Sequence, residues 1–301
     1  MNKPRVRCFG SSQPFVNMLK DTNQDFIVQS TSSTDIIITE KQKRIYNKVS
    51  QRFVSKGEMI LQKKLKKDIE KKTENQLIIR DPKDKVKYFR FDKSIREMSE
   101  MLGEIVSIKN LIEMDITMAY YQVAFNLGYM SKEMLDISKD IPKYMRLRLL
   151  GSIASRKMID TYSGNKLIDT CVKEDQKMRD IYFNIRKKTD EIIIECADAI
   201  RDYFIFYWVD GIYFKKDEKI KDDLLQPSVE IIKYIFEKHN LAYTTKSIEK
   251  MIIINENKNI YLQLFNNGIK KSEFYVPRND VKQYYIENEH GFYKEILAEH
   301  I

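Results

Sequence analysis

Apolar positions along the chain recur with two periods, one typical of helices and one typical of strands. A hairpin is predicted over residues 204–214, where Asp210 and Gly211 mark the turn between two apolar runs. Helical spacing predicts helices over residues 41–76, 92–107, 118–130, 131–160, 172–201 and 229–239. Short apolar or alternating runs predict strands at 36–38, 77–79, 86–91, 111–116, 241–245, 251–254, 260–264 and 274–276. Helices mixed with antiparallel strands indicate an α+β fold.

Composition indicates a folded protein that does not cross a membrane. The 301 residues are 43% hydrophobic and 11% aromatic, enough for one large domain or two small ones. No apolar run approaches the roughly 20 residues of a membrane span, and no apolar signal core follows the N-terminus. The three cysteines lie far apart, which favours reduced thiols. We therefore expect a cytoplasmic protein, in the host cell cytoplasm if the protein is viral.

Positive charge is concentrated in one segment. Residues 41–90 hold 17 Lys and Arg against 6 Asp and Glu, whereas the rest of the chain sums to −2. Such a segment is typical of a nucleic-acid contact, because each phosphate bound releases counterions. Lys63, Lys64, Lys66 and Lys67 are its densest part. The alternative is a well-solvated helix.

Two aspartates stand in settings that suit metal ligands. Asp115 interrupts an apolar strand, where an acid is costly unless it is paired or metal-bound. Asp210 lies at a predicted bend before Gly211. Mg²⁺ (or Mn²⁺) takes hard oxygen ligands, here the two carboxylates and the neighbouring carbonyl of Ile116. Brought together on adjacent strands, the acids would hold the metal pair used in phosphoryl transfer. The alternative is that Asp115 caps a helix and Asp210 only makes a turn.

The segment from Asp115 to Tyr121, which reads DITMAYY, resembles the first palm motif of family-B DNA polymerases, D-x-x-S-L-Y-P. The resemblance implies that Asp115 is a metal ligand and that Tyr120 stacks under the sugar and excludes ribonucleotides. The segment from Trp208 to Phe214, WVDGIYF, resembles the D-T-D-S motif and its following strand. Asp210 matches the second Asp of that motif, while Trp208 replaces the first.

Residues 146–157 stand where that family has its fingers motif, K-x-x-x-N-S-x-Y-G. On a predicted helix, Arg146 and Arg148, or Arg156 and Lys157, are the cations expected to bind the triphosphate. The alternative is a surface helix with alternating arginines. Lys258 and Tyr261 resemble the K-x-Y element near primer DNA.

The resemblance covers about residues 110–265 and implies three stretches. These are a basic, helical or mixed N-terminal region over 1–91, a palm over 92–265 with reduced fingers at 118–160, and a C-terminal extension over 266–301. Palm-like proteins of bacteriophages are similar in the hairpin motif.

Three functions follow as hypotheses. The first is a minimal phage-type DNA polymerase with DNA template–primer and dNTPs as partners. The second is a degenerate palm that binds nucleic acid as a replication accessory or virion protein, supported by the replacement at Trp208. The third is a helical scaffold that binds no nucleic acid, with Tyr- and Met-rich faces as interfaces.

Overall fold

The structure is a computed structural model of the chain. The residues that it describes are 17, 19, 26–30, 34–41, 43–47, 52–81, 86, 89–92, 95, 106–154, 157–163, 166–217, 226–256, 259–276, 281–288 and 291–298. By contacts the chain forms two compact units, one of residues 1–71 with 143–179 and the other of 72–142 with 180–301. This grouping differs from the three stretches expected from the sequence, because 143–179 joins the N-terminal residues.

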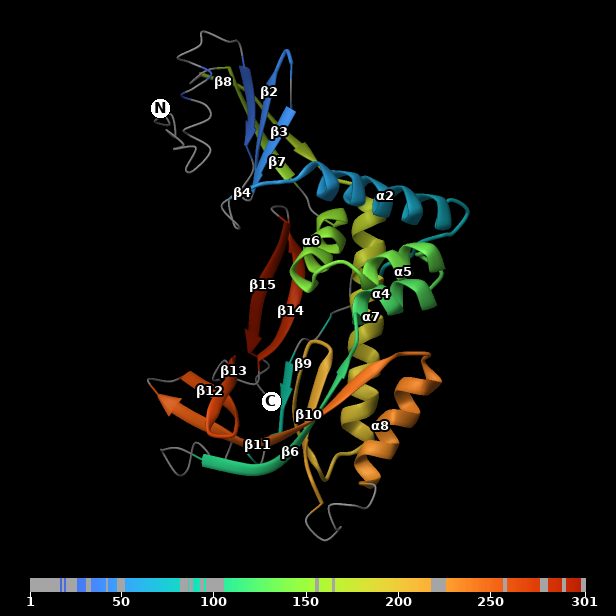
Figure 1. The fold of residues 1–301 in the computed structure, drawn as a ribbon, viewed down its shortest axis with the longest axis vertical. Helices are drawn as coiled ribbons and strands as arrows, with labels where there is room; N and C mark the ends of the chain where they lie inside the picture. The colour runs from blue at the N-terminus through green and yellow to red at the C-terminus, as the bar shows by residue number, and fades with distance from the viewer. Residues whose placement is uncertain are drawn as a thin grey trace. The chain divides into compact units, whose positions relative to one another are not determined.

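The first unit is built on a six-stranded antiparallel sheet (Figure 1). In the order in which they lie side by side, its strands are β4 (Arg52–Phe53), β3 (Lys43–Asn47), β2 (Thr34–Thr39), β1 (Phe26–Ser30), β7 (Lys157–Ser163) and β8 (Lys166–Lys173). Two helices belong to the same unit, α2 (Lys56–Lys72) and α6 (Lys143–Ile153). Leu19, Val28 and Ile37 belong to the buried apolar cluster of this unit.

Two predictions for this unit are wrong. A helix was expected over residues 41–76, but 43–47 form β3 and 52–53 form β4, so the basic N-terminal region is not all helical. Ile45 and Phe53 fit a helical period, yet β3 pairs with its neighbours in sequence, β2 and β4, and this hairpin pairing overrides the helical spacing. The helix expected over 131–160 is also interrupted, because its last part starts β7.

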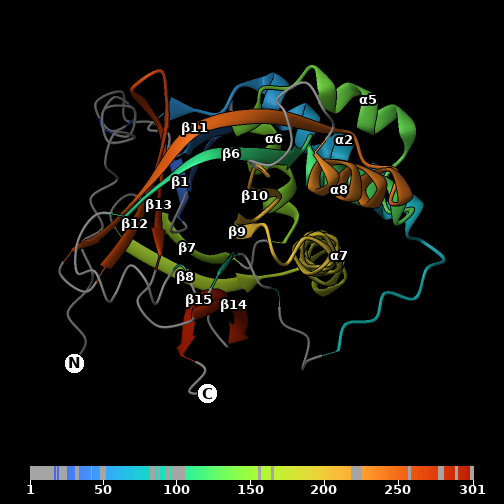
Figure 2. The same ribbon diagram turned by 90° about the horizontal axis from the view of Figure 1, so that it is seen from below.

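The second unit carries a seven-stranded antiparallel sheet. Its strands, in spatial order, are β13 (Ile269–Val276), β12 (Asn259–Asn266), β11 (Tyr243–Glu256), β6 (Val106–Ile116), β10 (Gly211–Lys215), β9 (Phe204–Trp208) and β5 (Phe89–Phe91). Figure 2 shows the long, curved β6 and β11 running side by side. A further hairpin consists of β14 (Val281–Asn288) and β15 (Gly291–Ala298).

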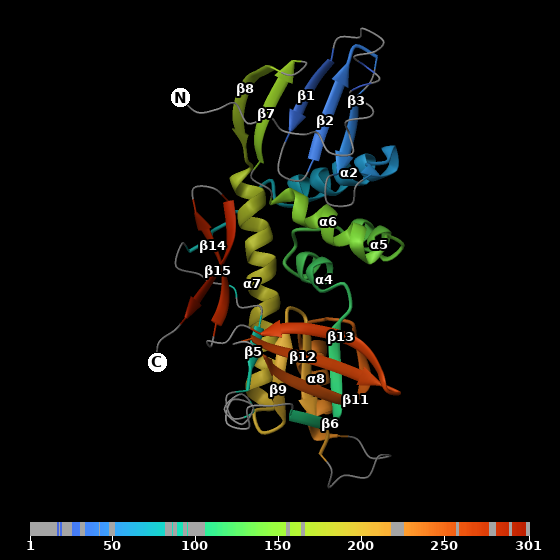
Figure 3. The same cartoon turned by 90° about the vertical axis from the view of Figure 1, so that its left-hand side faces the viewer.

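Helices cover one face of this sheet. They include most of α7 (Gln176–Ala199) and α8 (Pro227–Lys238), while α4 (Ala119–Asn126) and α5 (Lys132–Lys139) follow β6 along the chain. In Figure 3, α7 and α8 lie behind the strands and β12 and β13 curl across the front. The Tyr207 hydroxyl of β9 bonds Asp190 of α7 at 3.3 Å, and Phe236 of α8 packs against Tyr243 of β11.

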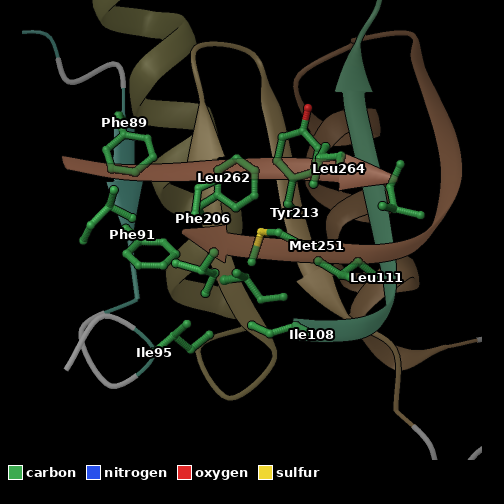
Figure 4. Close-up of a cluster of buried hydrophobic side chains, with 14 of the residues drawn as sticks. Phe89, Phe91, Ile95, Ile108, Leu111, Phe206, Tyr213, Met251, Leu262 and Leu264 are labelled. Carbon is green, nitrogen blue, oxygen red and sulfur yellow. The ribbon is translucent and has the colours of Figure 1, made fainter. Parts of the chain in front are cut away.

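The opposite face holds an apolar cluster inside the curl of the sheet (Figure 4). Phe206 and Tyr213 both belong to it, with their rings stacked at 4.2 Å and only 3° from parallel. Leu111, Met251 and Leu262 come to it from three further strands. Burial of this much aliphatic and aromatic surface is the main favourable term for folding the unit.

Several predicted elements of the second unit are confirmed. The hairpin over 204–214 is β9 and β10, and the helices expected over 172–201 and 229–239 are α7 and α8. Pro227 at the start of α8 suits a first-turn position that needs no amide donor. The strand expected at 77–79 does not form, and most of the helix expected over 92–107 lies outside the described residues. Among the helices described, none has the length and apolar character needed to pass through a membrane. The chain therefore has an α+β fold with a curled antiparallel sheet.

Candidate functional site

Asp115 lies on β6 of the second unit, and Asp210 lies in the turn that leads into the adjacent strand β10. Asp115 is the penultimate residue of β6 and pairs across the ladder with Gly211, the first residue of β10. Asp210 immediately precedes Gly211, in the two-residue turn between β9 and β10. The Ile116 amide donates to the Asp210 carbonyl at 3.1 Å, which ties the turn to the end of β6.

The turn itself is strained. Val209 has φ of 57°, a region that β-branched residues rarely occupy. Such strain persists only where surrounding contacts hold it, and it is concentrated at functional sites. Here the turn is held by the Trp208–Gly211 pair on one side and by the bond from Ile116 on the other.

Alternation along β6 places its acids on the face opposite the helices. Glu113 and Asp115 share the side of Leu111, whereas Ile112, Met114 and Ile116 point to the other side and are buried. We call the side that bears Glu113, Asp115 and Tyr213 the acid-bearing face. It is continuous with the apolar cluster, because Leu111 and Tyr213 belong to both.

Strand register arranges this face in two cross-strand rows. The first row runs across β5, β9, β10, β6 and β11 as Phe89, Trp208, Gly211, Asp115 and Thr244. The second row, in the same strand order, is Phe91, Phe206, Tyr213, Glu113 and Lys246. Each row is aromatic at the β5–β9 end and polar at the β6–β11 end. Directly opposed side chains interact, so the acids are positioned by their register.

Gly211 leaves room for oxygen atoms above the strand. A Cβ atom at this position would lie 3.2 Å from Oδ1 of Asp115 and 3.6 Å from the hydroxyl oxygen of Tyr213. The first distance is shorter than nine in ten real Cβ contacts. Because residue 211 has no side chain, the Asp115 carboxylate and the Tyr213 hydroxyl both border the space that a Cβ atom would fill.

Glu113 is held from both sides on the second row. The Tyr213 hydroxyl and the Lys246 ammonium each lie 3.3 Å from its Oε1 atom. Burial raises the pKa of Tyr213 well above its usual range, and the charges of Glu113, Asp115 and Asp210 raise it further. The phenol is therefore neutral at ordinary pH and donates its proton to Glu113. All three carboxylates are near enough to act on this one hydroxyl.

Tyr120 lies in the first turn of α4, beside α7. Its ring meets that of Tyr182 edge to face at 6.2 Å, and the Arg186 guanidinium lies 5.8 Å from the Tyr120 ring. Both partners come from α7, the helix that leads to the β9–β10 hairpin. Its predicted role in selecting the sugar stays a prediction.

Trp208 has a packing role in the structure. Its ring lies 5.6 Å from that of Phe89 and 5.4 Å from that of Phe274. It thus occupies the aromatic part of the first row, next to Gly211 and two strands from Asp115. An acid at 208 would have these rings as neighbours.

The cations expected to bind the triphosphate belong to the first unit. Arg148 of α6 makes a 2.5 Å ion pair with Glu58, which is almost fully buried. Glu58 also caps α2, because it accepts from the Ser55 amide while the Ser55 hydroxyl accepts from the Glu58 amide. Arg148 is therefore engaged in structure. Arg146 lies on α6 and Lys157 begins β7, whereas Arg156 lies outside the described residues.

The lysines expected to contact nucleic acid lie on α2. Leu65 and Ile69 form its buried side, and Lys63, Lys64, Lys66 and Lys67 are exposed. The hydrogen bond from Lys66 to Asp175, 3.0 Å long, raises the pKa of that lysine. Tyr261 lies on β12 opposite Ile254, and Lys258 lies outside the described residues.

The donor set on the acid-bearing face fits a divalent cation only in part. Asp115 and Asp210 supply hard oxygen atoms at neighbouring backbone positions, and the space above Gly211 gives the Asp115 carboxylate room. Within the described part of the chain, however, no group of three or more Asp, Glu, His or Cys side chains is arranged to hold a metal. A pair of carboxylates suits Mg²⁺ that keeps water or substrate oxygens as its other ligands.

Sequence reasoning missed Glu113, Tyr213 and Lys246. The spacing of Glu113 and Asp115 by two residues in a predicted strand already places them on one face. The other two partners depend on register between segments that are 100 and 133 residues apart, which no local pattern specifies. Neither a scan against protein-family models nor a search of curated proteins gives a match for this chain. Any functional assignment therefore depends on the chemistry of this face.

Proposed function

We propose that the protein is a template-directed nucleotidyl transferase, similar to a DNA polymerase, that works by a two-metal mechanism. The observation that supports this most is the register of β6 and β10, which brings Asp115 and Asp210 together beside the strained turn. Asp115 on the acid-bearing face of β6, with Asp210 in the turn beside it, suits a substrate that approaches from that face.

In this proposal Asp115 and Asp210, with the carbonyl of Ile116, hold Mg²⁺ or Mn²⁺. When bound, the metal pair activates the attacking hydroxyl and stabilises charge on the phosphate. Tyr120 limits the space at the sugar and so favours dNTPs. Arg146, Arg156 and Lys157 stay predicted triphosphate ligands, and DNA template–primer is the partner. Viral replication is the setting that the proposed activity suits.

Primer extension tests the proposal. Purified protein is given a labelled primer–template, dNTPs and Mg²⁺ or Mn²⁺, and single-nucleotide incorporation is timed. Asp115→Asn and Asp210→Asn keep the side-chain shape and remove the charge, so each is expected to lower the rate at least about 100-fold, as lost transition-state electrostatics do. Asp202→Asn, at an exposed acid just before β9, is the control and keeps wild-type rate. Incorporation that survives both site substitutions contradicts the proposal.

The second candidate function is a palm-like protein that binds nucleic acid without copying it, as an accessory or virion protein. The packing of Trp208 between Phe89 and Phe274 favours it, because an aromatic ring stands where the resemblance expects an acid. Under this proposal the exposed lysines of α2 contact phosphates, and nucleotide incorporation is absent in the wild type.

Salt-dependent DNA binding tests this second function. Replacing Lys63, Lys64 and Lys67 with Gln is expected to reduce the slope of log K against log salt concentration by up to about three. Lys132→Gln with Lys139→Gln, on exposed positions of α5, is the control and leaves the slope unchanged. An unchanged slope in the α2 variant contradicts this proposal.

A further inference from the structure

Three tyrosines of the β9–β10 region each bond a carboxylate, but only one shares the face of Asp115. Tyr203 bonds Asp217 at 2.9 Å, just before β9, and Tyr207 bonds Asp190 on the helix-covered side. Tyr213 bonds Glu113 on the acid-bearing face. The chain therefore offers two internal controls for the hydroxyl of Tyr213.

The Tyr213 ring has little freedom to move. It stacks against Phe206 at 4.2 Å and meets Phe274 edge to face at 5.8 Å. Figure 4 shows the ring at the margin of the apolar cluster, with its hydroxyl oxygen directed away from the other labelled side chains. Because the ring is fixed in this way, the position of the Tyr213 hydroxyl oxygen is also fixed.

The hydroxyl oxygen of Tyr213 lies next to the space above Gly211. The hydroxyl oxygen and Oδ1 of Asp115 lie 3.6 Å and 3.2 Å from the same point, the position that a Cβ atom at 211 would take. On its other side the hydroxyl is anchored to Glu113, whose Oε1 atom also accepts from Lys246. The Asp115 carboxylate and the Tyr213 hydroxyl thus both border the space above Gly211, and Glu113 anchors the hydroxyl there.

We propose that Tyr213 is a positioning residue for Asp115, and that Glu113 and Lys246 fix the hydroxyl that limits where the Asp115 carboxylate can lie. This inference builds on the proposed function but makes a claim of its own about coupling between two side chains. It differs from a packing role because it depends on the hydroxyl and not on the ring. Misplacement of a reacting group by about 1 Å can slow a reaction by about 100-fold, so such a role has a kinetic consequence.

Tyr213→Phe isolates the hydroxyl, because the ring and its stacking on Phe206 are retained. The first readout is a double-mutant cycle with Asp115→Asn in urea unfolding, which needs no enzymatic activity. If the two groups share the space above Gly211, their effects on the unfolding equilibrium constant are non-additive by at least about three-fold. Tyr203→Phe with Asp115→Asn is the control cycle and is additive. Additivity in the Tyr213 cycle overturns the proposal.

The second readout separates positioning from stability in the same preparations. Tyr213→Phe is expected to lower the kcat of nucleotide incorporation about ten-fold with little change in KM for dNTP, as for an interaction made only in the transition state. Tyr203→Phe and Tyr207→Phe keep wild-type kcat. Unchanged kcat in Tyr213→Phe contradicts the positioning role. Failure of wild type to incorporate nucleotides, together with a non-additive cycle, contradicts the proposed function while supporting the coupling.

Discussion

The two halves of the acid-bearing face lie on one pleated sheet yet differ in kind. At the β5–β9 end the rows hold Phe89, Phe91, Phe206 and Trp208, and at the β6–β11 end they hold Asp115, Thr244, Glu113 and Lys246. The aromatic half is packed in the curl of the sheet, whereas Thr244 and Lys246 are exposed. Strand β10 joins them with its smallest and its largest residue on this face, Gly211 and Tyr213. The aromatic half thus fixes where the polar half can present its oxygens.

The largest contrast is expected in stability. Phe206→Ala removes a fully buried ring from the centre of the cluster, and its loss is expected to lower the free energy of unfolding by about 3–5 kcal/mol. Lys246→Gln, in the same row, breaks only a half-exposed ion pair and costs less than about 1 kcal/mol. Urea unfolding of both variants measures the difference. Equal losses would remove the distinction between the halves.

Placing an acid in the aromatic half sharpens the comparison. Trp208→Asp restores the acid that the polymerase motif has at this position, but it removes ring contacts with Phe89 and Phe274. We expect a loss of about 2–3 kcal/mol in unfolding free energy, below that of a fully buried ring because Trp208 is half-buried. Trp208→Phe is the control and loses about 1 kcal/mol or less. Wild-type stability in Trp208→Asp would show that the ring has no packing role.

Alkaline pH tests the environment of the Tyr213 hydroxyl, on the strand that joins the aromatic and polar halves of the face. The pKa of Tyr213 is raised in the folded state, so the unfolded chain releases this proton first, at about pH 10. Stability from this group is complete below that pH and is lost as pH rises above it, by about 1.4 kcal/mol per pH unit. Unfolding free energies at pH 9–11 should fall less steeply in Tyr213→Phe than in wild type. If the unfolding free energies of Tyr213→Phe and wild type fell equally steeply with pH, the raised pKa of Tyr213 would be contradicted.

The smallest effect on stability is expected at Gly211, on the strand that joins the two halves of the face. Gly211→Ala places a Cβ atom against the Asp115 carboxylate, which can rotate away. We expect a loss within about 1 kcal/mol but a clear drop in nucleotide incorporation. Gly151→Ala, in α6 with nothing within 4 Å of its new Cβ atom, is the matched control. It is expected to stabilise the protein by about 0.5–1 kcal/mol. Full activity in Gly211→Ala would mean that the space above the glycine is not needed.

Local pattern predicted the parts of the fold that carry their own turn or helix-start signals. The β9–β10 hairpin has the Asp210–Gly211 turn and α8 has Pro227 in its first turn, so they were found. Strands β3 and β4 were not, because Ile45 and Phe53 also fit a helical period and hairpin pairing with the neighbouring strands overrides it.

The candidate site was predictable to the same extent. The two aspartates stand out because each breaks an apolar run. The contacts of Glu113 with Tyr213 and Lys246 depend on register between distant strands. Whether Arg148 is available to bind a phosphate depends on a buried partner 90 residues away. Composition and spacing determine neither.

Binding of Mn²⁺ to the protein, followed by isothermal titration without DNA or nucleotide, tests most directly whether Asp115 and Asp210 hold a cation together. We predict that wild type binds Mn²⁺ and that Asp115→Asn and Asp210→Asn each weaken binding at least about ten-fold, while Asp202→Asn does not. Mn²⁺ affinity that is the same in wild type and in both site variants would contradict the account.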